Sequence, residues 1–515
     1  MSSRLNTSKL PQMLLMPRKK LCAGRSFFAP SSSNAVYMGP ADHLRFIGIK
    51  FTRVSTAGAL IFSIVDLGSA NTTTNHSNNV IFDRCWFAGI EGTFPQSAST
   101  DTSTTRALYL AQSNHVAVID SYISNIYDNG NTASNGNTDA QCVGGGAGSK
   151  QLSGWGIYKF VNNHCEGGSE GLILGGSGGP ALTPVGCTQG VNCTLDVPAD
   201  VEIRRNYFFR PNFWNGNTTT INSAGWPNAK NGLEFKTGAR ILIEGNIFEN
   251  CWYSSQPYCY VIDYAPKNQM NSTTDPGSCP SCLVQDAVAR YNYGYNYPGA
   301  LLATYTTSFV GGCAGCGQTL GRRLVMHDNL VGDKLNRGSL TLTGFDGLEL
   351  ESTAGPLLSV SFTHNTFVNA YRSSILGGAS TNSAGNSGIN NLVFQNNITT
   401  FTPASGGNTF LPAPAGCSTT GQTFQAFLTA CVTTWTVDHN GLFNVSNLNG
   451  WPAGNLFQTT AAGVGFVNYN GGDSLFNPGN YALTNVSPFH NAASDGTDIG
   501  ANIPLLMQMI AGVRQ

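Results

Sequence analysis

A group of charged side chains near the middle of the chain has the types and spacing that acid–base chemistry requires. Glu234 and Lys236 are two residues apart, so in a strand they point to the same face. Asp263 and Lys267 follow in the next unit of the repeat described below, and Glu170 lies in the preceding one. Two acids and an amine in proximity can neutralise a carboxylate, remove a proton and protonate a leaving group.

This pattern fits two reactions on a sugar chain. β-Elimination of a uronide needs a base such as a lysine of lowered pKa, for which Lys236 and Lys267 are the candidates. Glu234 and Asp263 would then bind a metal ion, calcium being the candidate, or do acid–base work. These two carboxylates could instead be the acid and base of a glycoside hydrolase. The structural alternative is that they are ordinary solvated charges on the face of a sheet.

A second set of charges recurs at one position of the repeat, two residues before a recurring asparagine. Arg204, Glu244 and Arg290 hold this position in successive units. An arginine there can pair bidentately with the carboxylate of a uronate. The alternative is an ion-pair ladder in which Glu244 uses the donors of both arginines, and this alternative is slightly favoured.

Aromatic side chains near these charges are candidates for stacking on sugar rings. We single out Trp252, Tyr253, Tyr293 and Tyr305 as substrate-binding residues. In a strand, successive side chains alternate between the two faces, so half of the tyrosines in the run 291–297 point into the core. The aromatic signal is therefore only moderately specific.

The chain has 14 cysteines, several of them close in sequence, such as Cys251 and Cys259. An even number in a loop-rich chain indicates an oxidising compartment. Two CxxC motifs could form a four-cysteine zinc site, although disulfides are favoured; these cysteines are Cys279, Cys282, Cys313 and Cys316. No metal site is assigned.

A repeat in the sequence indicates which strands position these residues. Strands that end in asparagine followed by an apolar or aromatic residue recur 32 to 46 residues apart; the asparagines are Asn163, Asn206, Asn246, Asn292, Asn329, Asn365, Asn397 and Asn440. Cys85 and Ser121 hold the same position in two earlier units. A second short strand, such as 232–235 or 260–262, precedes each of these strands or lies between them. This amounts to about ten turns of one unit.

Short regular strands would also fit a β-sandwich, but a sandwich does not explain one asparagine in each unit. In stacked parallel coils, corresponding residues lie directly above one another, so a buried asparagine at a corner can bond to its neighbours. Asparagine also tolerates the left-handed backbone that such a corner needs. The sequence therefore predicts an all-β, right-handed parallel β-helix of about ten coils with an asparagine ladder.

The sequence resembles the right-handed parallel β-helix proteins of the pectate-lyase-like superfamily. The segment 203–252, with IRRNYFFRPNFW and NGLEFKTGARILIEGNIFENCW, is similar to a largely uncharacterised bacterial group, as is the ending SDGTDIG. The resemblance implies glycan lyases, glycoside hydrolases, esterases or adhesins, so it does not select a reaction. The aspartate cluster of pectin hydrolases and the calcium and arginine pattern of true pectate lyases are not apparent in the sequence.

We expect residues 1–40 to be an N-terminal segment remaining from a cap or early coil, 41–401 the parallel β-helix, and 402–515 the last coils and a C-terminal cap. Ile503 to Val513 could form a capping helix, and a Cys417–Cys431 disulfide would hold the cap. The first residues lack the apolar core of a signal peptide, and we expect the sequence to begin after one.

The composition of the chain limits the kinds of partner that it is expected to bind. Charged residues make up 11% of the chain, against roughly 25% in typical soluble domains. With a net charge of −1, nothing predicts binding to nucleic acid or an anionic membrane. No apolar run is long enough to span a bilayer. The oligomeric state is not predicted.

Together these features favour an extracytoplasmic polysaccharide lyase acting on an acidic glycan. A non-catalytic glycan-binding or adhesion protein is the second hypothesis, and a closed ion-pair network at the charged residues would favour it. A glycoside hydrolase is the third.

Overall fold

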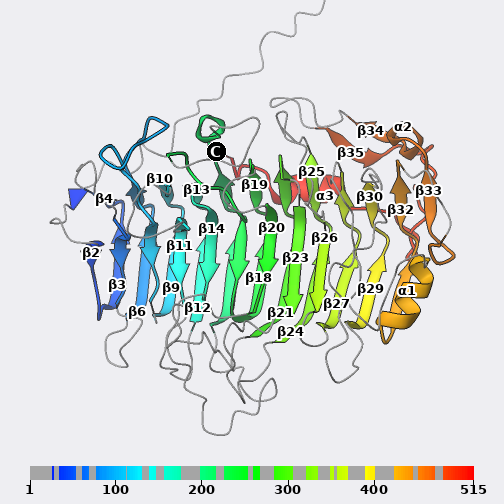
Figure 1. Cartoon of the computed structure of the whole chain (residues 1–515), viewed down its shortest axis with the longest axis horizontal. Coiled ribbons are helices and arrows are strands. Elements are labelled where there is room, and N and C mark those ends of the chain that lie inside the picture. Colours follow the sequence, from blue (N-terminus) through cyan, green and yellow to red (C-terminus); the bar gives the residue numbers. More distant parts are fainter. Residues whose placement is uncertain are drawn as a thin grey trace, which may run out of the picture.

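The structure is a computed structural model that describes residues 26–27, 34–53, 61–68, 77–111, 113–129, 139–146, 156–175, 198–215, 225–252, 259–266, 283–297, 299–305, 320–333, 348–352, 357–368, 389–400, 423–444, 450–469 and 479–514. Three long sheets run along the molecule, and all their strand pairs are parallel. Successive strands of the chain visit the three sheets in turn, so the chain winds as a solenoid (Figure 1). This is the right-handed parallel β-helix that the sequence predicts.

We name the three sheets A, B and C. Sheet A contains β1 (Ser26–Phe27), β4 (Lys50–Thr52), β7 (Trp86–Ala88), β10 (Tyr122–Ile126), β13 (His164–Gly167), β16 (Tyr207–Phe209), β19 (Ile247–Glu249), β22 (Tyr293–Tyr295), β25 (Leu330–Asp333), β28 (Thr366–Phe367), β30 (Ile398–Thr400), β32 (Gly441–Phe443) and β33 (Leu456–Gln458). Sheet B contains β2 (Asn34–Tyr37), β5 (Ser63–Asp66), β8 (Arg106–Tyr109), β11 (Gln141–Gly145), β14 (Glu170–Leu174), β17 (Leu233–Phe235), β20 (Tyr260–Tyr264), β23 (Gly299–Tyr305) and β26 (Leu348–Ser352).

Sheet C contains β3 (Asp42–Ile47), β6 (Asn78–Asp83), β9 (Asn114–Ile119), β12 (Gly156–Val161), β15 (Ala199–Arg204), β18 (Gly238–Glu244), β21 (Leu283–Arg290), β24 (Leu320–His327), β27 (Leu357–Thr363), β29 (Ile389–Gln395) and β31 (Trp435–Asp438). The remaining elements are the 3-10 turn η2 (Asn212–Trp214), the helices α1 (Phe424–Cys431), α2 (Ala461–Val464) and α3 (Ile503–Met509), and the antiparallel pair β34 (Phe466–Asn468) and β35 (Asn480–Leu483). None of the helices among the described residues is long and apolar enough to cross a membrane.

The recurring asparagines form a hydrogen-bonded column at the corner between sheets C and A. The side-chain amide of Asn246 donates to Oδ1 of Asn292 at 2.9 Å and to the carbonyl oxygen of Ile203 at 2.9 Å. Its own Oδ1 accepts from the backbone N–H and the side-chain amide of Asn206. The same bonds link every neighbouring pair from Asn163 to Asn440, and Asn455, which the sequence analysis did not include, extends the column by one coil.

The left-handed residue of this corner is the one before the asparagine, which corrects our expectation. Residues such as Asn162, Arg205, Tyr291 and Asp328 have φ between 54° and 59°. The asparagines themselves are not left-handed, because each must direct both its backbone N–H and its side chain toward the next coil. The sharp turn is therefore made by an outward residue, whose side chain is free to vary.

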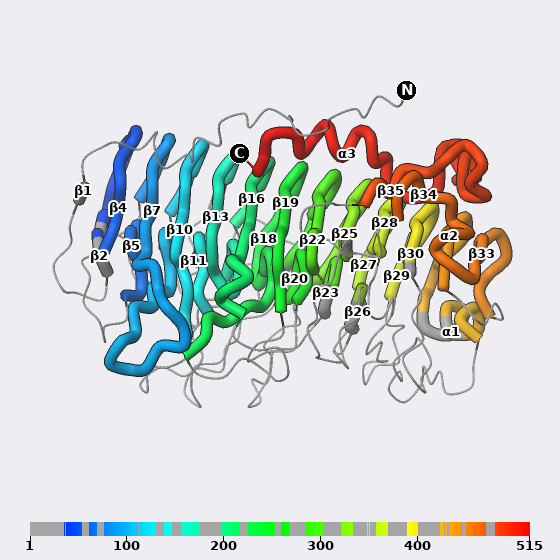
Figure 2. The backbone as a smooth tube through the Cα atoms, turned by 90° about the horizontal axis from the view of Figure 1, so that it is seen from above, coloured from blue at the N-terminus to red at the C-terminus, as the bar shows by residue number. Residues whose placement is uncertain are grey.

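The C-terminal segment 480–514 runs back along the outside of sheet A, and α3 lies beside its strands (Figure 2). Ile503, Leu506 and Ile510 pack in one apolar cluster with Tyr207 and Ile247 of sheet A. Polar contacts fix the segment as well, because the guanidinium of Arg205 donates to the carbonyl oxygens of residues 509 and 511 at 2.6 and 2.7 Å. The helix predicted in this region thus exists, but it covers the side of the solenoid and does not cap its end.

Candidate functional site

The charged residues singled out in the sequence meet on the outer face of sheet B. In β17, Leu233 and Phe235 point into the core, so Glu234 between them points outward. Parallel register places Glu234 beside Asp263 of β20. Glu170 begins β14 on the preceding coil, and Lys230 precedes β17. We call Glu170, Lys230, Glu234, Lys236 and Asp263 the charged cluster.

Ion pairs close this cluster. Lys230 Nζ lies 2.9 Å from a carboxylate oxygen of Glu170 and 2.9 Å from one of Glu234. Lys236 Nζ contacts the other oxygen of Glu234. Asp139 accepts from Lys230 at 3.2 Å at the edge of the cluster. Both glutamates are 0% exposed, so the charges are not the solvated surface charges that one reading of the sequence allows.

The two glutamates of the cluster have opposite pKa shifts. Burial, together with the nearby Asp139 carboxylate, raises the pKa of Glu170 well above its usual value. Burial acts in the same direction on Glu234, but the charges of Lys230 and Lys236 outweigh it and hold the pKa of Glu234 well below its usual value. Burial would lower the pKa of Lys230, yet the charges of Glu170 and Glu234 raise it. The surroundings therefore favour the protonated form of Glu170 and the ionised form of Glu234.

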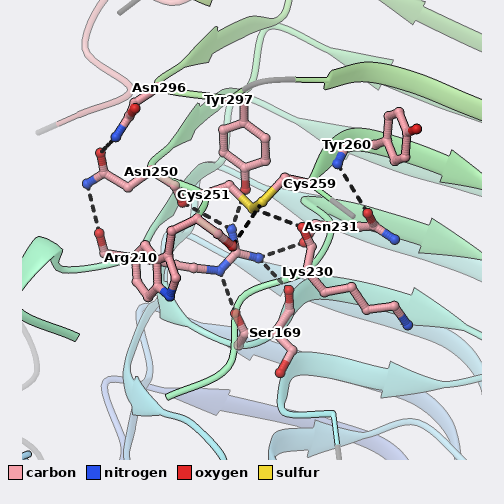
Figure 3. Close-up of a disulfide and its surroundings, with 12 residues drawn as sticks. Ser169, Arg210, Lys230, Asn231, Asn250, Cys251, Cys259, Tyr260, Asn296 and Tyr297 are labelled. Carbon is pink, nitrogen blue, oxygen red and sulfur yellow. Dashed lines mark hydrogen bonds between the residues drawn. A yellow bond between two sulfur atoms is a disulfide. The ribbon is translucent and has the colours of Figure 1, made fainter. Parts of the chain in front are cut away.

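Arg210 positions the segment that carries Lys230, and the sequence analysis did not identify it. Its buried guanidinium donates to the carbonyl oxygens of Gly168, Ser169 and Asn231 at 2.5 to 2.7 Å (Figure 3). The disulfide Cys251–Cys259 lies beside these groups. Asn231 in turn donates its side-chain amide to Asp263 Oδ2 at 3.0 Å. Only the fold brings residue 210 to this segment, because the two are far apart in the repeat and no sequence pattern relates them.

Two of the predicted aromatic sugar-binding residues, Trp252 and Tyr293, are buried. Trp252 is 6% and Tyr293 3% exposed, the first in the core and the second under the C-terminal segment. Tyr305 ends β23, and its backbone pairs with Ser352 of β26. Tyr253 and Lys267 lie outside the described residues, as do Cys279, Cys282, Cys313, Cys316 and Cys417.

Arg204, Glu244 and Arg290 form a ladder of ion pairs on sheet C. Arg204 Nη2 lies 2.9 Å from Glu244 Oε1, and Arg290 Nη2 lies 2.6 Å from Glu244 Oε2. Arg204 also pairs with Glu202, which pairs with Lys159 of the preceding coil. Each carboxylate of this ladder thus lies between two cations. This is the ion-pair ladder that the sequence suggested as the alternative to a uronate site.

Arg106 differs from the arginines of this ladder. It begins β8 on the same outer face as the charged cluster, with Gln141 and then Glu170 as its register partners on the next two coils. The guanidinium lies over the ring of Tyr109, 5.3 Å from its centroid, and both side chains are half-buried. Among the described residues, the guanidinium has neither a hydrogen bond nor an ion pair within 4 Å. In the sequence, Arg106 is visible only as a single arginine at the start of a strand. The strand register of the folded chain is needed to place it on the same face as the charged cluster.

Four of the described cysteines form two disulfides, Cys142–Cys165 and Cys251–Cys259. The second joins two cysteines that are close in sequence, whereas the first joins sheets B and A and was not predicted. Disulfides persist in oxidising compartments.

The comparisons with known proteins concern the fold. No family model and no curated protein matches the sequence. Similar solved structures include the PL6-family alginate lyase AlyGC, with 14% identity, a TM-score of 0.38, and coverage of 92% of this chain and 58% of that chain. A mutant tailspike protein of E. coli bacteriophage HK620 in complex with a pentasaccharide has 12% identity, a TM-score of 0.33, and coverage of 83% and 56%. This chain therefore spans less than two thirds of either neighbour.

A hollow lies between the C-terminal segment and the corner of sheets C and A. Its volume is about 600 Å³, and its lining includes Tyr291, Asp328, His364, His490 and Asp495. The polar groups are largely engaged with one another, since His364 lies 3.2 Å from Asp495 and His490 lies 2.6 Å from Asp498. This hollow is shaped by the C-terminal segment, which we interpret as a structural element.

Asp66 of β5 provides a test of how this face titrates. Burial raises its pKa to about 6, against 3.8 for an ordinary aspartate, although the Gly68 N–H and the charge of Arg106 act to lower it. Because the folded pKa is raised, the unfolding free energy should fall as pH rises from about 4 to about 6. Asp66→Asn should reduce this fall and be more stable than the wild type at pH 7. Urea unfolding at pH 4, 5, 6 and 7 measures the unfolding free energies of the wild type and the variant. Equal unfolding free energies of the wild type and Asp66→Asn at pH 7 would contradict the raised pKa of Asp66.

Proposed function

We propose that the protein is an extracytoplasmic carbohydrate-active protein that binds a polysaccharide along the outer face of sheet B. The two disulfides support a compartment outside the reducing cytoplasm. A solenoid aligns the outward residues of consecutive coils about 4.8 Å apart, a surface on which an extended polymer can make repeated contacts.

The other two faces offer less to such a polymer. Sheet A is covered from β16 to β32 by the C-terminal segment, which packs against its outward apolar side chains. On sheet C, the charged side chains pair with one another along the ladder from Lys159 to Arg290, and Arg240 and Arg323 pair with Asp200 and Asp286. Binding a charged glycan on sheet C would have to compete with these pairs.

The observation that carries the proposal is the composition of the sheet B face. Few residues of this chain are charged, yet this face places seven of them, from Arg106 to Asp263, on consecutive coils, together with Tyr109 and Gln141. One end of the row, at Arg106 and Tyr109, is partly exposed and therefore accessible to a ligand. The other end is the closed cluster around Glu234, so we place recognition at the first end.

Cleavage of an acidic glycan is the second candidate function, and one observation favours it. Adjacent carboxyl groups with oppositely shifted pKa values, here Glu170 and Glu234, are the arrangement in which one acts as acid and the other as base or nucleophile. A lyase would use Lys236 as its base with Asp263 nearby, since the raised pKa of Lys230 keeps that amine protonated. Either reaction requires the buried cluster to open to substrate.

One experiment tests both candidates. The purified protein is titrated with a panel of polyuronates and neutral polysaccharides, with calcium or with chelator, while binding, ultraviolet absorbance at the wavelength of unsaturated uronides and reducing ends are followed. We expect binding to at least one polysaccharide with no change in the other two signals. Rising absorbance would instead establish a lyase, and reducing ends alone a hydrolase. If the protein shows no binding, no rise in absorbance and no release of reducing ends, the proposed function is overturned.

If cleavage is observed, Glu170→Gln provides the diagnostic variant. The amide resembles the protonated carboxyl group that the raised pKa of Glu170 favours, so the fold should be retained while the transferable proton is lost. Turnover should then disappear, and turnover at the wild-type rate would exclude Glu170 as the acid.

A further inference from the structure

The sheet B face contains a set of polar atoms that the charged cluster does not use. Nε of Arg106 and Oε1 of Gln141 are buried without a hydrogen-bond partner. Gln141 is 2% exposed, and its amide nitrogen is occupied by the carbonyl oxygen of Asp139 and by Glu170 Oε2 at 3.1 Å. A buried donor and a buried acceptor left unpaired are costly, and each costs about 1–3 kcal/mol.

Gly144 brings these two atoms to one place. A Cβ at residue 144 would lie 3.0 Å from Arg106 Nε and 3.0 Å from Gln141 Oε1. A larger residue at position 144 would therefore press on both side chains and displace them. The donor and the acceptor lie close to the same point above the backbone. Both atoms are covered in this structure, so a ligand hydroxyl group that accepts from the first and donates to the second reaches them when the half-buried Arg106 side chain turns outward.

The guanidinium is held in place by its surroundings and not by a counter-ion. The ring of Tyr109 supports one face at 5.3 Å. The charge of Arg106 also reaches Asp66, whose pKa it lowers, but no ion pair within 4 Å forms between them. The other ionisable groups of this face, Asp139 and Glu170, are bonded to Lys230. An arginine with unused donors is a receptor for a planar carboxylate.

We propose that Arg106, Tyr109, Gln141 and Gly144 form a subsite for the carboxylate and an adjacent hydroxyl group of a uronate residue. The inference rests on the proposed function and adds the substrate class, an acidic glycan. The guanidinium binds the carboxylate, and the sugar hydroxyl pairs Arg106 Nε with Gln141 Oε1. The ladder at Arg204 and Arg290 lacks this capacity because Glu244 and Glu202 occupy its donors.

The test compares a polyuronate with its carboxyl-reduced, neutral counterpart of equal length. Arg106→Gln should weaken binding of the polyuronate by about 10- to 100-fold, as expected for loss of a charge-assisted bidentate contact, and leave binding of the neutral polymer unchanged. Arg106→Lys should recover only part of the affinity, because an ammonium does not bind a carboxylate bidentately.

Arg240→Gln is the matched control, since it removes the same charge from sheet C. It should bind the polyuronate within twofold of the wild type. Equal losses in Arg106→Gln and Arg240→Gln, or wild-type affinity in Arg106→Gln, would overturn the subsite while leaving the proposed function standing. A wild-type protein that binds only neutral glycans would also overturn it. A wild-type protein that binds no polysaccharide would remove the proposed function and the subsite together.

Discussion

Asn246→Leu is expected to lower the free energy of unfolding by about 3–6 kcal/mol, enough to unfold many single domains. The side chain is fully buried in the middle of the asparagine column. Its Oδ1 accepts two bonds from Asn206, and its amide donates to Asn292 and to the carbonyl oxygen of Ile203. Leucine has similar size but satisfies none of these groups, so several polar atoms remain buried without partners.

Chemical denaturation followed by circular dichroism measures this effect, with two control variants. Asn246→Asp retains the acceptor but loses the donor, and should fall between the wild type and Asn246→Leu. Asn212→Leu changes an exposed asparagine in η2 and should alter stability by no more than about 0.5 kcal/mol. If Asn246→Leu unfolds at the wild-type denaturant concentration, the column does not stabilise the fold as its hydrogen bonds indicate.

Glu234→Gln is expected to destabilise the protein by about 3–5 kcal/mol, because it leaves buried ammonium groups without their counter-charge. Lys236 makes its ion pair with Glu234, and Lys230 lies 2.9 Å from the same carboxylate. The effect should depend on pH. Because the folded pKa of Glu234 is lowered, its stabilising contribution is present above the ordinary glutamate pKa and is lost as pH falls below it.

Glu170→Gln is the matched control for this prediction, because it makes the same chemical change within the same cluster. The pKa of Glu170 is raised whereas that of Glu234 is lowered, so replacing Glu170 by the neutral amide should cost less stability than replacing Glu234. A double variant, Glu234→Gln with Lys236→Met, should be less destabilised than the sum of the two single variants. Equal melting temperatures for Glu234→Gln and Glu170→Gln would show that the cluster is hydrated and open.

These two predictions differ in how much of each the sequence alone supports. The asparagine column could be predicted because its cause is periodic, one polar residue at the same place in every turn. The structure changed one detail, in that the left-handed residue precedes the asparagine. The direction of Glu234 could also be predicted, since alternation in a strand fixes which face a side chain takes.

The sequence by itself determined the architecture, because a solenoid is built from local units whose apolar and asparagine positions recur along the chain. It also determined that Glu234, Lys236 and Asp263 share a face. Only the tertiary structure decided that this face is buried there, that Lys230 and Arg210 complete it, and that Arg106 remains unpaired. Burial and pairing depend on contacts between residues whose separations along the sequence follow no period. The same reason explains why α3 runs along sheet A and covers Tyr293, a contact between residues distant in sequence.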